Sequence, residues 1–214
     1  MTPITLRAAG LAAMLALAPL GAQAQQLLAP PPEQPDVLMH AVTEEVIAIL
    51  KKDMAAGQPT DIARLVETRI VSVFDFRRMT SIAMARNWRL ASPEQQAALV
   101  AQFRTLLVRT YSLALSDYRD QEIDYKPLRA AAGDNEVLVR SSVRRPGAET
   151  LSIDYEMANG LAGWQVYDVK VGGVSLVINY REAFAETVNA RGIDGLIKAL
   201  SDKNDSTAKR AAKR

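Results

Sequence analysis

Residues 136–171, EVLVRSSVRRPGAETLSIDYEMANGLAGWQVYDVKV, decide the fold class of this chain. Apolar and polar side chains alternate along three segments of this stretch, and turn residues at 145–147 and 159–160 separate the segments. Such alternation is typical of antiparallel strands with one buried face. Because a further alternating segment lies at 122–125, the sequence predicts a four-stranded antiparallel sheet over about 122–171.

The last predicted strand, 164–171, has apolar side chains on both of its faces. Val166 falls on one face of an extended segment, whereas Tyr167 and Val169 fall on the other. A strand of this kind is either covered on both sides or contains a β-bulge. The sequence leaves both possibilities open.

Before the sheet, apolar residues have the three-to-four-residue spacing of amphipathic helices. Asp36 is a candidate N-cap for a first helix that ends at residues 57–59 (GQP), and Thr60 or Asp61 is a candidate cap for a second. A short third helix is expected after residues 74–76 (FDF).

The clearest helix start in the chain is Ser92-Pro93-Glu94-Gln95. Ser92 is a good N-cap, Pro93 suits the first helical position, and Gln95 completes a capping box. No helix breaker follows until about Ser116, so we expect a helix of about 24 residues, or about 36 Å. Its apolar face is broad, which implies burial against more than one neighbour.

After the sheet, the pattern predicts two closing helices, at about 175–189 and 193–200, although residues 174–178 would also suit a strand. The order of elements is helices, then sheet, then helices. This order indicates an α+β fold.

Both ends of the chain differ in composition from the body. Residues 1–24 contain Arg7, an apolar run at 8–20 and the small-residue site Ala22-Gln23-Ala24, which together are typical of a cleaved secretory signal. The run is shorter than the roughly 20 residues that a membrane-spanning helix needs. A proline-rich lead-in is predicted at 25–36 and a polar, basic, disordered tail at 201–214.

Composition excludes several kinds of chemistry. The 214 residues include no cysteine and one histidine, His40, so thiol nucleophiles, disulfides and multi-histidine metal sites are absent. Hydrophobic residues make up 49% of the chain, as in an ordinary globular domain. Between 25 and 200 the chain carries 20 basic and 22 acidic residues, so no electrostatic signature of nucleic-acid binding exists.

Known catalytic motifs are also missing. A serine triad would need His40, whose position at the start of the first helix suits a surface residue. Phosphate-binding and dinucleotide-binding glycine motifs do not occur. Asp154 and Glu156 could mimic a glycosidase pair, but polar alternation on a half-solvated sheet explains them better.

Two features allow more than one interpretation. The arginines at 77, 78, 86 and 89 are either solvated helix ends or contacts for a phosphate or an acidic partner. The surplus of aliphatic side chains on the sheet and the long helix is either core or the lining of a ligand cavity. Periodicity alone does not separate core from cavity.

Four blocks of sequence resemble the MlaC family of periplasmic phospholipid-binding proteins, also called the toluene-tolerance auxiliary component. They are VFDFRRMTSIAMARNWRLASPEQ (73–95), FRTLLVRTY (103–111), GWQVYDVKVGGVSLVINYR (163–181) and GIDGLI (192–197). The blocks occur in the family's order, and the similarity extends over about 37–204.

This resemblance implies a domain at 37–200, with a helical part at about 37–118, a sheet at about 122–171 and closing helices at about 175–200. The implied fold is a curved four-stranded antiparallel sheet, similar to that of nuclear transport factor two, wrapped by six or seven helices. The acyl chains of a phospholipid would lie between the sheet and the helices, with the headgroup facing solvent.

The resemblance also implies a periplasmic shuttle and no enzyme, with phospholipid as cargo and no cofactor. Its partners would be an outer-membrane lipoprotein–porin complex and an inner-membrane ABC transporter with a membrane-anchored lipid-binding ring. Two alternatives remain open: a hydrolase or isomerase of the same fold that uses Asp154, Asp168 or tyrosines, and a purely structural periplasmic adaptor.

Apolar periodicity within the region of resemblance, about 37–204, predicts the residues that would face the acyl chains. They are Met79, Ile82, Phe103, Leu107, Tyr111, Val139, Ile153, Tyr155, Tyr167 and Val169. A rim that meets the headgroup or a partner protein is predicted at Arg77, Arg78 and Arg86.

Overall fold

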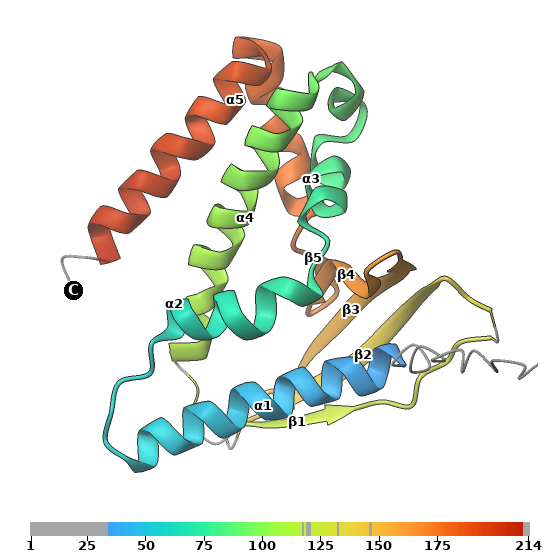
Figure 1. Cartoon of the computed structure of the whole chain (residues 1–214), viewed down its shortest axis with the longest axis vertical. Coiled ribbons are helices and arrows are strands. Elements are labelled where there is room, and N and C mark those ends of the chain that lie inside the picture. The colour runs from blue at the N-terminus through green and yellow to red at the C-terminus, as the bar shows by residue number, and fades with distance from the viewer. Residues whose placement is uncertain (1–33, 117, 119–120, 132, 146, 212–214) are drawn as a thin grey trace, which may run out of the picture. The chain divides into compact units, whose positions relative to one another are not determined.

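A computed structural model describes residues 34–211 except 117, 119, 120, 132 and 146 (Figure 1). The predicted signal peptide at 1–24, most of the lead-in and the last three residues lie outside the described part. None of the described helices is long and apolar enough to cross a membrane.

The described residues form an α+β fold around one open antiparallel sheet, in which the strands are neighbours in chain order. Its five strands are β1 (Glu122–Tyr125), β2 (Glu136–Arg144), β3 (Leu151–Gly160), β4 (Gly163–Val171) and β5 (Val174–Ser175). The prediction of four strands is therefore wrong. Gly172 and Gly173 both adopt positive φ, which turns the chain back so that Val174 pairs with Val171.

Five α-helices lie in the described part, with short π and 3₁₀ turns between them. They are α1 (Pro35–Ala55), α2 (Ile62–Leu65), α3 (Phe76–Met84), α4 (Pro93–Ser116) and α5 (Arg181–Ala211). The prediction of six or seven helices is wrong as well. The two predicted closing helices correspond to the two parts of α5, because the backbone of Gly192, at φ 71° and ψ −178°, is not helical and kinks the element there.

The end of α5 corrects the prediction of a disordered tail from residue 201. Residues 201–211 are helical, and contacts of Asn204 join this part of α5 to α4. Asn204 is buried, and its side-chain amide donates to the backbone carbonyl and the side-chain oxygen of Gln102 at 3.0 and 2.9 Å. Arg109 on α4 donates in turn to the carbonyl of Asn204.

The predicted start of α4 is confirmed by its hydrogen bonds. The amide of Gln95 donates to Oγ of Ser92 at 3.2 Å, and the amide of Ser92 donates to Oε1 of Gln95 at 3.0 Å. These two bonds satisfy backbone donors that the first helical turn leaves unpaired. Helix α3 is capped by Asp75, which accepts from the amide of Arg78 at 2.8 Å.

β4 contains a β-bulge, one of the two arrangements that its apolar pattern allows. Glu156 pairs with Asp168 and Met157 pairs with Val166, so Tyr167 is the extra residue. The bulge places Val166 and Val169 on the same inner face, where both are buried. The described part has three packing regions. One joins α3, α4 and α5, a second joins the inner face of the sheet to the start of α1, and a third joins α1 and α2 to the end of α4 and Tyr118.

Candidate functional site

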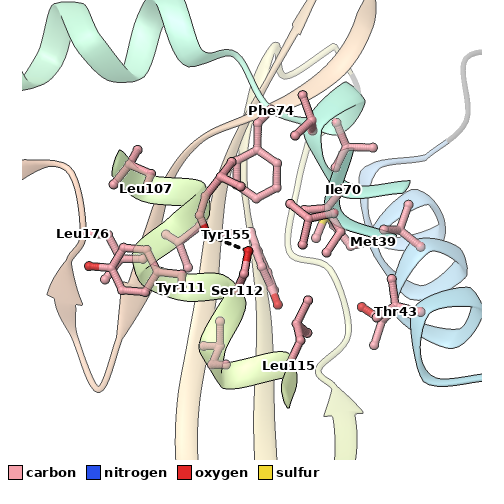
Figure 2. A pocket seen from close by; sticks show the side chains of 18 of the residues that line it. Met39, Thr43, Ile70, Phe74, Leu107, Tyr111, Ser112, Leu115, Tyr155 and Leu176 are labelled. Carbon is pink, nitrogen blue, oxygen red and sulfur yellow. Dashed lines mark hydrogen bonds between the residues drawn. The ribbon is translucent and has the colours of Figure 1, made fainter. Parts of the chain in front are cut away.

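An apolar cavity of about 350 Å³ lies between α1, the chain from Val66 to Phe76, the second half of α4 and the inner face of the sheet (Figure 2). Its lining consists of Met39, Val42, Thr43, Val46, Ile47, Leu50, Val66, Ile70, Val71, Val73, Phe74, Phe76, Met79, Leu107, Val108, Tyr111, Ser112, Leu115, Tyr118, Ile123, Ile153, Tyr155, Val169, Val171 and Leu176. A volume of this size lies within the range of roughly 300–1,000 Å³ that small-molecule sites occupy.

The chemistry of the lining suits hydrocarbon. None of the described lining residues is charged, and the polar side chains among them are serine, threonine and tyrosine hydroxyls. Ser112, for example, donates to the carbonyl of Val108 one turn earlier in α4, which leaves its hydroxyl proton already paired (Figure 2). An ion or a strongly polar group would find little compensation for its lost hydration here.

Helix α1 forms one wall because its apolar residues recur at helical spacing. Val42, Val46 and Leu50, which share a face in the sequence pattern, all line the cavity, and Met39 extends the same row. Figure 2 shows Met39 and Thr43 approaching from α1, opposite Leu107 and Tyr111 of α4.

The chain between α2 and α3 forms a second wall and has an irregular backbone. A π-helical turn at Val66–Ile70 is followed by a 3₁₀ turn at Val71–Val73 and by an extended residue, Phe74. These changes of helical pitch let neighbouring residues face the same side. The amide of Asp75 donates to the carbonyl of Val166 at 2.9 Å, which ties this wall to β4.

Hydroxyl groups connect α1 to the sheet beside the cavity. The hydroxyl of Tyr125 donates to the carbonyl of Met39 at 3.1 Å and lies 2.6 Å from Oγ1 of Thr43. Tyr155 is also hydrogen-bonded to Tyr125. Burial raises the pKa of both tyrosines, so these hydroxyls stay protonated at neutral pH and act as hydrogen-bonding groups.

Tyr111 lies where the cavity wall meets solvent, with 36% of its surface exposed. Burial, and next the neighbouring Tyr180 to which it is hydrogen-bonded, raise the pKa of Tyr111 to about 12. Tyr111 and Leu176 both line the cavity. Tyr111 is thus an amphipathic side chain with an apolar ring inside and a hydroxyl outside.

Six of the ten residues predicted to face an acyl chain line this cavity: Met79, Leu107, Tyr111, Ile153, Tyr155 and Val169. The other four do not. Phe103 packs edge-on against Tyr180 and Phe184, and Ile82 lies against the same helical core. Val139 is buried in the sheet core, and Tyr167 occupies the bulge of β4.

The mismatches have a common cause, since periodicity indicates which face of an element is buried but not what covers it. No residue of α1 or of Val66–Phe74 is among those predicted to face an acyl chain. A signal was present in α1, in the row Val42, Val46 and Leu50. Between Val66 and Phe74 the helical spacing covers Val66 and Ile70, whereas the 3₁₀ turn and the extended Phe74 that follow break the helical period.

The three predicted rim arginines do not line the cavity. Arg77 donates to Oε1 of Gln96 at 2.9 Å and lies over the ring of Trp88. Arg86 is exposed. Their role towards a headgroup or a partner stays a prediction.

Arg78 is held on the other side of the sheet by two neighbours. It forms an ion pair of 2.7 Å with Glu136, and its guanidinium lies 3.6 Å from the centre of the Tyr167 ring. A hydrogen bond from Arg78 lowers the pKa of Glu136. These contacts account for Tyr167 pointing away from the cavity.

Two of the three carboxylates considered for an enzyme, Glu156 and Asp168, have structural partners. Glu156 forms an ion pair of 2.6 Å with Lys170. Asp168 is buried and accepts from the amides of Val169 and Val177, at 2.8 and 3.2 Å, and from the hydroxyl of Ser175. Among the described residues, no group of three or more histidine, aspartate or glutamate side chains could hold a metal ion.

The names of known proteins similar to this chain refer to phospholipid binding, phospholipid transport or toluene tolerance. A solved structure from Ralstonia solanacearum, a phospholipid-binding protein in complex with a phospholipid, is 38% identical, covers 81% of this chain and 98% of its own, and has a TM-score of 0.72. Toluene tolerance protein ttg2D of Pseudomonas putida is 26% identical over 188 residues, which are 86% of this chain and 84% of that protein.

A third relative is the intermembrane phospholipid transport system binding protein MlaC of Haemophilus influenzae. It is 21% identical over 171 residues, which are 78% of this chain and 80% of that protein. The model of the MlaC protein family matches residues 40–202. That match spans well over half of the sequence, and this chain therefore belongs to the MlaC family.

Proposed function

We propose that this protein binds a phospholipid, holds the acyl chains in the cavity, and carries the lipid as cargo without transforming it. The observation that carries this proposal is the uncharged lining of the cavity in the described residues. Each methylene removed from water contributes about 0.8 kcal/mol, so a two-chain lipid with about 30 methylenes gains on the order of 24 kcal/mol before the cost of opening the site. A cavity of this kind is what crossing an aqueous space requires.

The relatives support the same proposal. The protein from Ralstonia solanacearum, 38% identical to this chain, has a phospholipid bound, and the relative from Haemophilus influenzae is named for intermembrane phospholipid transport. We further propose that the mature protein is exported through its predicted signal at 1–24 and works in the periplasm. There it would exchange lipid with an outer-membrane lipoprotein–porin complex and an inner-membrane ABC transporter that carries a membrane-anchored lipid-binding ring.

Native mass spectrometry and organic extraction of the purified mature protein test the binding proposal. We expect phospholipid at a fixed stoichiometry. The double substitution Leu107→Phe with Val169→Phe adds bulk inside the cavity and should displace lipid while the protein stays folded, because the added rings occupy existing space.

The control places the same two changes outside the cavity. Leu90 and Val174 are 72% and 60% exposed, so Leu90→Phe with Val174→Phe should leave the lipid content unchanged. A wild-type protein without lipid, or a cavity variant that retains all of it, would show that the proposal is wrong.

A further inference from the structure

A groove of about 340 Å³ lies between α1 and β1, the strand at one edge of the sheet (Figure 1). His40, Glu44, Ile47 and Lys51 recur every three or four residues along α1 and form one wall of the groove. All four residues of β1, Glu122–Tyr125, lie on the opposite wall. This space, which we call the α1–β1 groove, therefore runs along the whole edge strand.

Two residues of β1 turn their backbone hydrogen-bonding groups away from the sheet. The amide of Lys126 donates to the carbonyl of Arg140 at 2.9 Å, so these residues form a hydrogen-bonded pair. Because hydrogen-bonded pairs alternate along an antiparallel ladder, the N–H and C=O groups of Ile123 and Tyr125 point away from β2. Within the described part, no strand lies beyond β1 and these four groups have no hydrogen-bond partner. The edge can therefore accept one more strand.

The side chains give the groove an apolar side and an acidic side. Ile47 and Ile123 line both the groove and the apolar cavity, so the side of the groove next to the cavity is apolar. Neighbouring residues of a strand point to opposite faces of the sheet, so Glu122 and Asp124 lie on the other face of β1. An added strand would have alternate side chains beside isoleucine and beside carboxylate.

The charges of the groove favour a cation. Its lining holds three carboxylates, those of Glu44, Glu122 and Asp124, and one ammonium, that of Lys51. Glu122 and Asp124 share a single guanidinium, that of Arg144, at 3.1 and 2.7 Å. Glu44 lies 3.5 Å from Nδ1 of His40 and pairs with no lysine or arginine of the described part. Three acidic groups against two basic ones leave an excess of negative charge.

We infer that the α1–β1 groove binds an extended, basic segment of a partner protein, which adds to the sheet as a further strand beside β1. Strand addition of this kind uses the backbone of an edge strand for affinity and alternate side chains for specificity. The segment that fits has apolar residues beside Ile47 and Ile123 and basic residues beside Glu122 and Asp124.

The same charges disfavour a second copy of this chain as the occupant. Pairing of two β1 strands would bring Glu122 and Asp124 of one copy close to the same carboxylates of the other, which is destabilising. Natural proteins place charges on edge strands to prevent unwanted pairing of this type. Carboxylates that repel a like-charged strand attract a basic one, so they select the partner.

The experiment measures binding of a fluorescein-labelled, eight-residue peptide of alternating lysine and valine to the mature protein by fluorescence anisotropy at low salt. The peptide should bind, and a peptide with glutamate in place of lysine should not. N-methylation of every amide of the lysine–valine peptide keeps its charge but removes its N–H donors, and should weaken binding by about tenfold. A peptide with four lysines followed by four valines should also bind more weakly, because its side chains do not alternate.

On the protein, Glu44→Gln with Glu122→Gln should weaken binding of the lysine–valine peptide by about three- to tenfold, the range for two exposed charge pairs. Glu149→Gln with Glu186→Gln is the matched control. Both residues are exposed, lie outside the groove and undergo the same loss of charge, so affinity should stay at the wild-type value.

The remaining outcomes overturn the inference. A wild-type protein that binds no lysine–valine peptide lacks the site. Equal binding of the N-methylated or the block peptide would show attraction of charge without strand addition, and an equal loss in the control variant would place the peptide elsewhere. Sedimentation that shows a dimer strengthened by Glu44→Gln with Glu122→Gln would assign the edge to a second copy instead.

Discussion

Oγ1 of Thr43 lies 2.6 Å from the hydroxyl oxygen of Tyr125, and this contact joins α1 to β1 across 82 positions of the chain. The Tyr125 hydroxyl has one proton, which it donates to the carbonyl of Met39, so Thr43 is the donor in the pair. Thr43 lines the cavity. The pair therefore holds α1 against the sheet beside the cavity.

Removing either hydroxyl should destabilise the protein. Tyr125→Phe and Thr43→Val each delete one partner, and we expect each to lower the free energy of unfolding by about 1 kcal/mol. The double variant should cost less than the sum of the two, because both changes remove the same bond. Urea unfolding followed by circular dichroism measures all three variants, and additive losses would show that the hydroxyls are not coupled. Thr187→Ala is the control, since its exposed hydroxyl bonds only within α5.

Replacing Asp168 should lower the free energy of unfolding more than replacing an exposed aspartate. It accepts three hydrogen bonds at a site that is 2% exposed, and two of the donors, Ser175 and Val177, flank the cavity residue Leu176. In Asp168→Asn an amide group faces donors, so we expect a loss of about 2–3 kcal/mol in thermal or urea unfolding. Asp202→Asn, at an exposed ion pair, should cost less than about 1 kcal/mol. Equal losses in the two variants would contradict this account.

Tyr111 should make the protein less stable at alkaline pH. Its pKa in the folded state is about 12, above the usual tyrosine value of about 10. The stabilisation that comes from the raised pKa of Tyr111 is complete at pH values below the pKa of tyrosine in the unfolded chain. It is lost as pH rises through the folded-state pKa, because Tyr111 loses its proton at a lower pH in the unfolded chain than in the folded one. Urea midpoints measured at neutral and at alkaline pH should thus fall less steeply in Tyr111→Phe than in the wild type. Parallel pH profiles would exclude this role for Tyr111.

Ala85 adopts a backbone conformation that favours glycine. It follows α3 with φ 48° and ψ −126°, and among the described residues it is the one non-glycine with positive φ. Ala85→Gly relieves this strain and should raise the free energy of unfolding by about 1 kcal/mol, after allowing for the greater freedom of glycine in the unfolded chain. Ala48→Gly, an exposed position within α1, should instead lower it by about 0.5–1 kcal/mol. A loss of stability in both variants would contradict the assigned strain.

Short sequence patterns predicted the helices and strands whose formation depends on residues close together in the chain. The capping box at Ser92 and Gln95 placed the start of α4, and two-residue alternation placed β2, β3 and β4. The predictions that were wrong depend on distant partners. The segment after Leu200 is helical because Asn204 is buried against Gln102, and Val174 forms a strand because it pairs with Val171.

The sequence by itself determined the α+β order, the absence of thiol chemistry and, through four resembling blocks, the family. Only the tertiary structure decided which buried faces line a cavity and which belong to the close-packed core. Phe103 and Leu107 lie one turn apart on α4, yet Phe103 meets Tyr180 and Phe184 while Leu107 meets the cavity. The hydrophobic periodicity of a single element predicts which of its faces is buried. A cavity arises where several elements, here α1, α4 and the sheet, leave a gap that their side chains do not fill.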